Sequence, residues 1–274
     1  MIELLCPVCG RRLRRGEKTW SCDGGHAFDV ARQGYVNLLP VTQKHSLHPG
    51  DTRQQVAARR AFLDRGFYLP IVRALAEETG RFCPGCQAVL DVGCGEGYYL
   101  SMLPQIPQRW GVDVSKEAVR YAAAREKRAC FLVATASHLP FADGSFDCLL
   151  SMFALTVVEE YRRVLKRGGV FIQVLAGENH LPRLKELIYP EVRQKEKHLH
   201  SQLAGFRLLH SRTLQFPFEL SEPQEVRDLL YMTPHVWRIT KEGAQRLEAV
   251  QRLQDEAQVV FNIYGRQERE NLLE

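Results

Sequence analysis

The stretch AVLDVGCGEGYY, residues 88–99, decides the fold of this chain. It is an apolar run that ends near Asp91, followed by a turn with three glycines and a helix that we expect to begin near Tyr98. A buried parallel strand, a glycine-rich turn and a helix form the unit that lets a ligand approach the backbone at the carboxyl edge of a sheet. The Asp91 carboxylate is placed to bind an ammonium group, directly or through water. The glycines that leave room for the approach are Gly93, Gly95 and Gly97.

Further apolar runs predict more strands of the same sheet, at residues 110–114, 131–135, 146–153 and 170–176. The first of these ends with Asp113, where a carboxylate can accept both ribose hydroxyls of an adenosine. An acidic residue there favours an unphosphorylated ribose. Proteins that bind NAD share these features but usually carry GxGxxG, whereas this turn reads GxGxG. The predicted fold class is α/β, with a Rossmann-like sheet.

The N-terminus carries a second pattern, made of metal-ligand residues. Cys6 and Cys9 lie two residues apart in a tight turn, and Cys22 and His26 follow across a short segment. Together they make a closed Cys3His tetrahedral set, the structural type of zinc site. The alternative is that they are ordinary buried thiols and a core or surface histidine. We expect a small zinc-ribbon-like module in which the metal supplies stability that so small a core lacks.

Charge is distributed unevenly along the 274 residues. The segment through residue 60 holds ten Lys or Arg against five Asp or Glu, so it carries the whole net charge of +5. A basic segment beside a neutral body is typical of a phosphate-contacting arm, although solubility explains many such biases. We find neither a membrane-spanning stretch nor a signal peptide and expect a cytoplasmic protein without membrane contact.

Three segments follow from these patterns. We expect a zinc-binding RNA-recognition module at 1–36, a linker and helical connection at 37–80, and the larger domain at 81–274. The connection contains Lys44 in an exposed stretch and a predicted helix at 54–64 that carries Arg59 and Arg60. For the two arginines, a solvated helix face and a contact with RNA phosphate are about equally compatible with the sequence.

Taken together, the larger domain resembles the class I S-adenosylmethionine-dependent methyltransferases. The motifs that carry the resemblance are DVGCGEGYY for the methionine-binding turn, DVS for the ribose acid and ASHLPF for the adenine-side loop. The resemblance implies S-adenosylmethionine as cofactor. The cofactor-binding residues would be Asp91, Gly93, Gly95, Glu96, Gly97, Tyr98, Asp113, Ser137, His138 and Leu139.

A narrower resemblance covers nearly the whole chain. GHAFDVARQGYVNLLP, PGDTRQQVAARRAFLDRGFY, MTPHVW and FNIY look like the family of 23S rRNA (guanine-N1)-methyltransferases, some of which give resistance to macrolide antibiotics. In that family the zinc domain helps to grip an rRNA hairpin while the larger domain holds the cofactor. The implied partner is 23S ribosomal RNA, and a homodimer is a further expectation. The chain departs from the family at Leu155, where Pro is usual, close to where the target base would lie.

The catalytic residue is not identified by the sequence. Guanine N1 carries a proton, so a base or a polarising contact is expected. Glu159 and Glu160 are weak candidates, since a solvated first helical turn explains them better. Phe153 is placed either to stack on a flipped base or to pack in the core. Alternatives to rRNA methylation are an RNA-binding protein with lost catalysis and a methyltransferase for another base or a small molecule.

Overall fold

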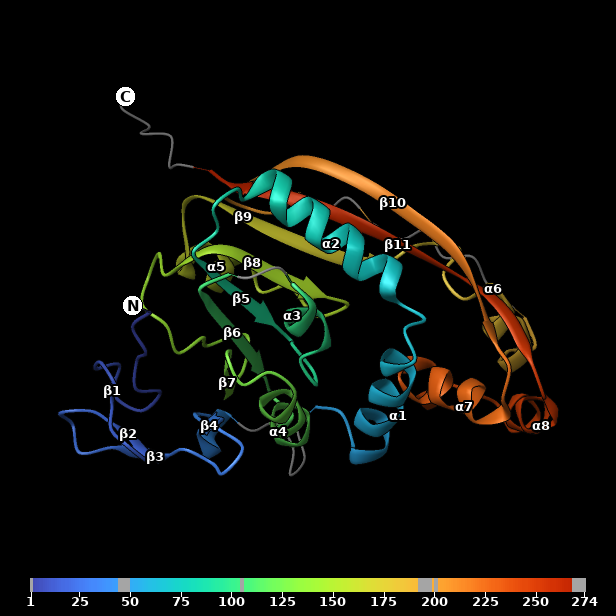
Figure 1. Cartoon of the computed structure of the whole chain (residues 1–274), viewed down its shortest axis with the longest axis horizontal. Helices are drawn as coiled ribbons and strands as arrows, with labels where there is room; N and C mark the ends of the chain where they lie inside the picture. Colours follow the sequence, from blue (N-terminus) through green and yellow to red (C-terminus); the bar gives the residue numbers. More distant parts are fainter. Residues whose placement is uncertain (1, 44–49, 104–105, 192–198, 200–201, 268–274) are drawn as a thin grey trace.

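The computed structural model describes residues 2–43, 50–103, 106–191, 199 and 202–267, and Figure 1 shows their arrangement. The described strands form a three-stranded sheet, in the order β1-β2-β3, and an eight-stranded sheet, in the order β10-β11-β9-β8-β5-β6-β7-β4. The strands are β1 (Arg14–Arg15), β2 (Thr19–Ser21), β3 (Ala27–Asp29), β4 (Val36–Asn37), β5 (Ala88–Val92), β6 (Gln108–Asp113), β7 (Cys130–Val133), β8 (Phe146–Met152), β9 (Leu165–Ala176), β10 (Phe206–Leu220) and β11 (Leu253–Arg266). The helices are η1 (Val41–Gln43), α1 (Arg53–Asp64), α2 (Leu69–Phe82), α3 (Tyr98–Met102), α4 (Lys116–Arg125), α5 (Val158–Val164), α6 (Pro182–Ile188), α7 (Pro223–Tyr231), η2 (Pro234–Trp237) and α8 (Lys241–Ala249).

The centre of the large sheet is the predicted parallel unit. Strand β5, buried at every residue, pairs in parallel with β6 on one side and β8 on the other. The chain runs outward through β6 and β7 and then returns to β8 and β9, so the strand order reverses beside β5. Ligands of open α/β sheets bind at such a reversal, beyond the carboxyl ends of the strands. The α/β, Rossmann-like fold class is confirmed.

Two long antiparallel strands complete the sheet and were not predicted from the sequence. Strands β10 and β11 pair with each other along their length, and β11 pairs antiparallel with β9. The FNIY motif, residues 261–264, lies in β11 and is buried throughout. Between these two strands the chain forms α7, η2 and α8, which gather with α6 at one end of the molecule (Figure 1).

Each face of the sheet has its own apolar cluster. On one face, α2 contributes Ile71 and Leu75, which pack in the same cluster as Val89 of β5. The other cluster contains Tyr161 of α5 together with Leu4 and Leu13 of the N-terminal module. The backbone N–H of Leu5 also donates to the carbonyl of Pro140 at 2.9 Å. The N-terminal module therefore adds its small core to that of the sheet.

The segment 37–80, expected to be a linker and helical connection, also contributes to the large sheet and its core. Strand β4 extends the large sheet by pairing in parallel with β7, and α2 shares the core of the sheet. Helix α1 begins with a capping box between Thr52 and Gln55, which satisfies backbone donors at its first turn. The three ranges 1–36, 37–80 and 81–274 remain a proposal.

No helix of the described part of the chain is long and apolar enough to span a bilayer.

Candidate active site and metal centre

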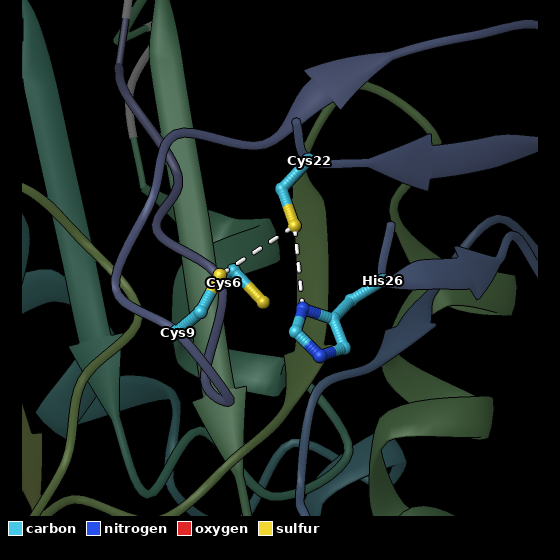
Figure 2. A group of neighbouring side chains, drawn as sticks. All are labelled: Cys6, Cys9, Cys22 and His26. Carbon is cyan, nitrogen blue, oxygen red and sulfur yellow. Dashed lines mark hydrogen bonds between the residues drawn. The ribbon is translucent and has the colours of Figure 1, made fainter. Parts of the chain in front are cut away.

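The four predicted zinc ligands converge at the N-terminal module, as Figure 2 shows. Their ligand atoms all lie within 4.8 Å of one another. The Sγ atoms of Cys9 and Cys22 are 3.6 Å apart, and Cys22 Sγ is 3.5 Å from Nδ1 of His26. Two sulfurs bound tetrahedrally to one zinc at about 2.3 Å each would be separated by about 3.8 Å. The residues therefore fit a Zn²⁺ ion held by three thiolates and one imidazole.

Two tight turns bring these ligands together. In the first, the N–H of Gly10 donates to the carbonyl of Cys6 at 2.8 Å, and in the second the N–H of Gly25 donates to the carbonyl of Cys22 at 3.0 Å. Gly24 lies against the ligands, because a Cβ there would come within 3.1 Å of Cys9 Sγ. Among the residues that the structure describes, this quartet is the one group with metal-ligand geometry.

The glycine turn after β5 forms a cradle at the strand reversal. Gly93, Gly95 and Gly97 have φ angles of 79°, 54° and 79°, which side-chain-bearing residues rarely adopt. A Cβ at Gly97 would lie 2.9 Å from that of Ala122, so this glycine lets the turn close onto α4. The space above Gly95 is open apart from an atom of Arg59 at 3.7 Å. The turn thus exposes backbone to a ligand.

Asp113 faces this cradle from the end of β6. One carboxylate oxygen accepts from the backbone N–H of Gly95 at 2.9 Å, and the other accepts from that of Ser115 at 2.8 Å. These two bonds fix the plane of the carboxylate while leaving a lone pair on each oxygen for a further donor. The arrangement suits two vicinal hydroxyls.

Two more carboxylates lie behind the turn. Burial, together with repulsion from Asp113 and Glu96, raises the pKa of Asp91 to about 8. Neither oxygen of Asp91 has a hydrogen-bond partner among the described residues. Burial also raises the pKa of Glu96, against the opposing effect of Arg125 and Arg59. A buried carboxylate without a partner is costly, so a cationic group or a water bound at the turn would stabilise Asp91.

A cavity of about 1560 Å³ opens over the turn and Asp113. It extends past Met152–Ala154 to segments at 176–191 and 232–238. A pocket for one small molecule usually measures roughly 300–1000 Å³. The cavity therefore has room for a nucleoside-sized cofactor and a second planar group.

Phe153 lines the cavity just after the end of β8. Its backbone is left-handed, with a φ of 57°, a strained conformation for a phenylalanine. Its side chain is 39% exposed and lines the cavity, so it is not a core residue. The ring centroids of Tyr68, Tyr99 and His180 lie 6.5, 6.4 and 6.2 Å from that of Phe153. An aromatic pocket thus surrounds the place where β8 ends.

Arg59 lies inside this site. It forms an ion pair with Asp51 and donates to the carbonyl of Met232 at 3.3 Å, and it lines the cavity beside Gly95. The hydroxyl of Ser115 donates to the carbonyl of Asp51 at 3.1 Å, which fastens this segment to the start of α4. The sequence pattern left Arg59 as an RNA contact or a solvated residue, because nothing local shows that α1 ends up over the glycine turn.

The other predicted site residues lie elsewhere. Tyr98 is buried below the guanidinium of Arg125, and Ser137, His138 and Leu139 lie outside the cavity lining, with both Ser137 and His138 exposed. Arg60 pairs with Asp64 at 3.4 Å and lies over the ring of Tyr121. Lys44 is outside the described residues.

The candidate catalytic glutamates also lie away from the cavity. Glu159 is exposed on α5. Glu160 accepts from the backbone N–H of Leu139 at 2.7 Å and pairs with Arg163 at 2.7 Å. These bonds hold the loop before β8, which is a structural role, and neither residue lines the cavity.

Comparison with known proteins identifies both parts of the chain. Residues 4–47 match the family model described as RlmA, N-terminal, and residues 90–173 match one described as methyltransferase domain. The chain is 40% identical over 211 residues to the 23S rRNA (guanine(748)-N(1))-methyltransferase of Streptomyces fradiae, which covers 73% of this chain and 74% of that protein. It is 34% identical over 259 residues to a candidate 23S rRNA (guanine-N(1)-)-methyltransferase of Micromonospora griseorubida, which covers 85% of this chain and 86% of that protein.

Solved structures support the fold of the larger part. A candidate type II methyltransferase from Anaeromyxobacter dehalogenans aligns with a TM-score of 0.50 and 22% identity, covering 71% of this chain and 95% of that one. At that identity the likeness concerns the fold alone. With the zinc quartet, the methyltransferase domain and relatives that match over most of their length, the chain belongs to the family of S-adenosylmethionine-dependent 23S rRNA (guanine-N1)-methyltransferases with an N-terminal zinc ribbon.

Proposed function

We propose that the protein methylates N1 of a guanine in a hairpin loop of 23S rRNA, and that the cavity at the strand reversal holds both the cofactor and the flipped base. The observation that carries this proposal is the cavity itself, which joins the glycine turn and Asp113 to an aromatic pocket around Phe153. The name of the Streptomyces fradiae relative gives guanine 748 of 23S rRNA as its target, and this guanine is the first position to test.

Asp113, Asp91 and Arg59 are proposed to hold S-adenosylmethionine, which supplies an electrophilic methyl group when bound. Asp113 would accept from the two ribose hydroxyls with the lone pairs that its backbone bonds leave available. Asp91 would balance the ammonium group, directly or through a water. In both roles a buried carboxylate gains a cationic or hydroxyl partner, which would stabilise its charged form.

We assign Arg59 to the cofactor carboxylate, in place of RNA phosphate. Its guanidinium lies over Gly95, and its side chain is 27% exposed, too enclosed for a surface contact with a polymer. The guanidinium already pairs with the carboxylate of Asp51, the type of group that it would bind in the cofactor. An arginine that pairs with a carboxylate in a half-buried site gives both charge and orientation.

Phe153 and its aromatic neighbours are proposed to hold the target base. Guanine in a hairpin must leave its stack before N1 can reach the methyl group, and an aromatic face stabilises the extruded base. Because methyl transfer needs chiefly the alignment of N1 with the methyl group, a rigid Phe153 at the end of β8 serves that alignment. Leu155, which replaces the usual proline, is 87% exposed and so does not fill the cavity.

The zinc ribbon is proposed to contact the RNA backbone. Its strand region 11–15 reads RRLRR, with Leu13 buried and the four arginines exposed. Arg14 pairs with Asp23 and Arg12 lies 3.9 Å from Glu3, so part of this charge is balanced within the module. Exposed arginines on one small sheet are suited to phosphate contacts that position a hairpin.

The decisive experiment is mass spectrometry of 23S rRNA nucleosides from cells with and without the gene, combined with a purified-enzyme assay on a hairpin transcript. We expect loss of one N1-methylguanosine in the deletion strain and its formation in vitro. A protein that binds the hairpin and S-adenosylmethionine but transfers no methyl group would instead be an RNA-binding protein without catalysis. Methylation of another base or of a small molecule would contradict the proposal directly.

A further inference from the structure

An exposed tryptophan lies next in sequence to residues that line the cavity. Trp237 is 69% exposed, although tryptophan is usually well buried in a folded protein. It ends η2, the short helix between α7 and α8. Its ring therefore contributes little to the core and is accessible to a partner.

The backbone under Trp237 is held firmly. The Thr233 hydroxyl accepts from the backbone N–H of His235 at 3.3 Å and donates to the carbonyl of Leu230 at 2.8 Å. The hydroxyl of Tyr189 lies 2.8 Å from Nδ1 of His235. These bonds tie η2 to both α7 and the end of α6, which gives the tryptophan a fixed base.

The neighbours of Trp237 belong to the cavity. Pro234, His235 and Arg238 line it, together with Met232, whose carbonyl receives the bond from Arg59. The exposed tryptophan therefore lies in the same short segment as these lining residues. Arg238 is also exposed and forms no ion pair with the described carboxylates.

We propose that Trp237 is a stacking platform for an unpaired base of the rRNA loop, next to the flipped guanine, and that Arg238 binds an adjacent phosphate. This inference rests on the proposed function, because it names how that RNA is held. A flipped nucleotide has neighbours that lose a stacking partner, and an indole presents a large flat surface to one of them. An arginine beside an aromatic ring is the combination that single-stranded nucleic acid favours.

The test compares Trp237→Ala, Trp237→Phe and Arg238→Ala in binding to the hairpin transcript over a range of salt concentrations. Stacking of one base is worth roughly 1–3 kcal/mol, so Trp237→Ala should weaken binding by about tenfold or more. Its salt dependence should stay that of the unmodified protein, because no phosphate contact is lost. Arg238→Ala should flatten the salt dependence by about one ion. Trp237→Phe should keep most of the affinity.

Fluorescence gives a second readout, since the chain has three tryptophans. The transcript should quench the emission of the unmodified protein, and this quenching should be largely lost in Trp237→Phe. Leu208→Ala, which changes a 42% exposed residue on β10, is the matched control and should bind like the unmodified protein. Zinc content should be unchanged in every variant, and cofactor affinity should be unchanged in the Trp237 and Leu208 variants.

Two outcomes would overturn the inference. One is unchanged RNA affinity in Trp237→Ala while the unmodified protein methylates the transcript, which leaves the proposed function intact. The other is a dimer that Trp237→Ala converts to a monomer, which would make the tryptophan a subunit contact. An unmodified protein that does not methylate or bind the transcript would instead contradict the proposed function.

Discussion

Replacement of Asp113 by alanine tests the cofactor site most directly. The change removes a carboxylate whose two oxygens accept from Gly95 and Ser115 and face the cavity. Two effects on cofactor affinity are expected. The ribose loses its acceptors, and the turn loses the bond that fastens Gly95 to the end of β6.

The size of the first effect follows from the number of ribose bonds. Each charge-assisted hydrogen bond contributes roughly 1.5–3 kcal/mol, and about 1.4 kcal/mol corresponds to a factor of ten in affinity. Loss of one bond at the low end weakens binding about tenfold, and loss of two weakens it about a hundredfold. We therefore expect the dissociation constant for S-adenosylmethionine to rise at least tenfold in Asp113→Ala.

The control is Asp147→Ala. Asp147 also accepts from two backbone N–H groups, those of Gln87 and Ala88 at 3.1 and 2.9 Å, but it lies at the other end of β5 and does not line the cavity. Its variant should destabilise the fold, because it loses these two bonds and the ion pair with Lys166 at 2.7 Å, and it should bind the cofactor normally. Similar affinity losses in the two variants would mean that Asp113 acts only through the fold.

Calorimetric titration with S-adenosylhomocysteine and its 2′-deoxyribose analogue separates the two effects in Asp113→Ala. Removal of the hydroxyl from the ligand should cost the unmodified protein about tenfold and should cost Asp113→Ala much less, because the acceptor is already gone. An equal cost in both proteins would refute the ribose contact. Unchanged binding of S-adenosylmethionine in Asp113→Ala would refute the site itself.

Three further predictions concern the other groups of the site. Cys22→Ser should reduce zinc from about one ion per chain and weaken hairpin binding while cofactor affinity stays within a few fold, since the quartet lies outside the cavity; metal analysis showing full zinc would contradict this. Asp91→Asn should stabilise the free protein more at pH 8 than at pH 5. The raised pKa of about 8 means that Asp91 keeps its proton in the folded protein and loses it in the unfolded chain, so the stability of the unmodified protein falls as the pH rises from about 4 to 8. Urea unfolding at both pH values measures the difference, and equal gains would count against this prediction. Phe153→Ala should lower the single-turnover methylation rate at least tenfold with little change in cofactor affinity, whereas a normal rate would remove Phe153 from the target-base site.

Local patterns in the sequence were sufficient to predict the zinc quartet and the glycine turn that faces Asp113. Cys6 and Cys9 lie in one tight turn and Cys22 and His26 in another, so short-range spacing places each pair of ligands. The strand, glycine turn and Asp113 likewise depend on contacts between neighbouring elements. Such features are readable because one residue type at one spacing satisfies a demanding backbone or metal geometry.

Residues whose environment depends on distant parts of the chain could not be placed in the same way. Arg59 meets Met232 across 173 positions, and only the folded arrangement of α1, the end of α7 and the glycine turn shows that it faces the cavity. For Glu160 the sequence favoured a solvated first helical turn over a catalytic base, whereas the structure pairs it with Arg163 and the Leu139 amide. For both residues, burial and the identity of the partner determine the role of the charge.

The sequence by itself therefore determined the fold class, the family and the metal and cofactor motifs, since these rest on local geometry that few residue types satisfy. Only the tertiary structure decided that β10 and β11 complete the sheet, that Phe153 adopts a left-handed backbone at the cavity, and that Trp237 stays exposed beside it. The sequence alone does not distinguish an apolar side chain that is buried from one that is exposed to a partner. Packing of segments far apart in the chain makes that choice, because burial is a property of the whole fold.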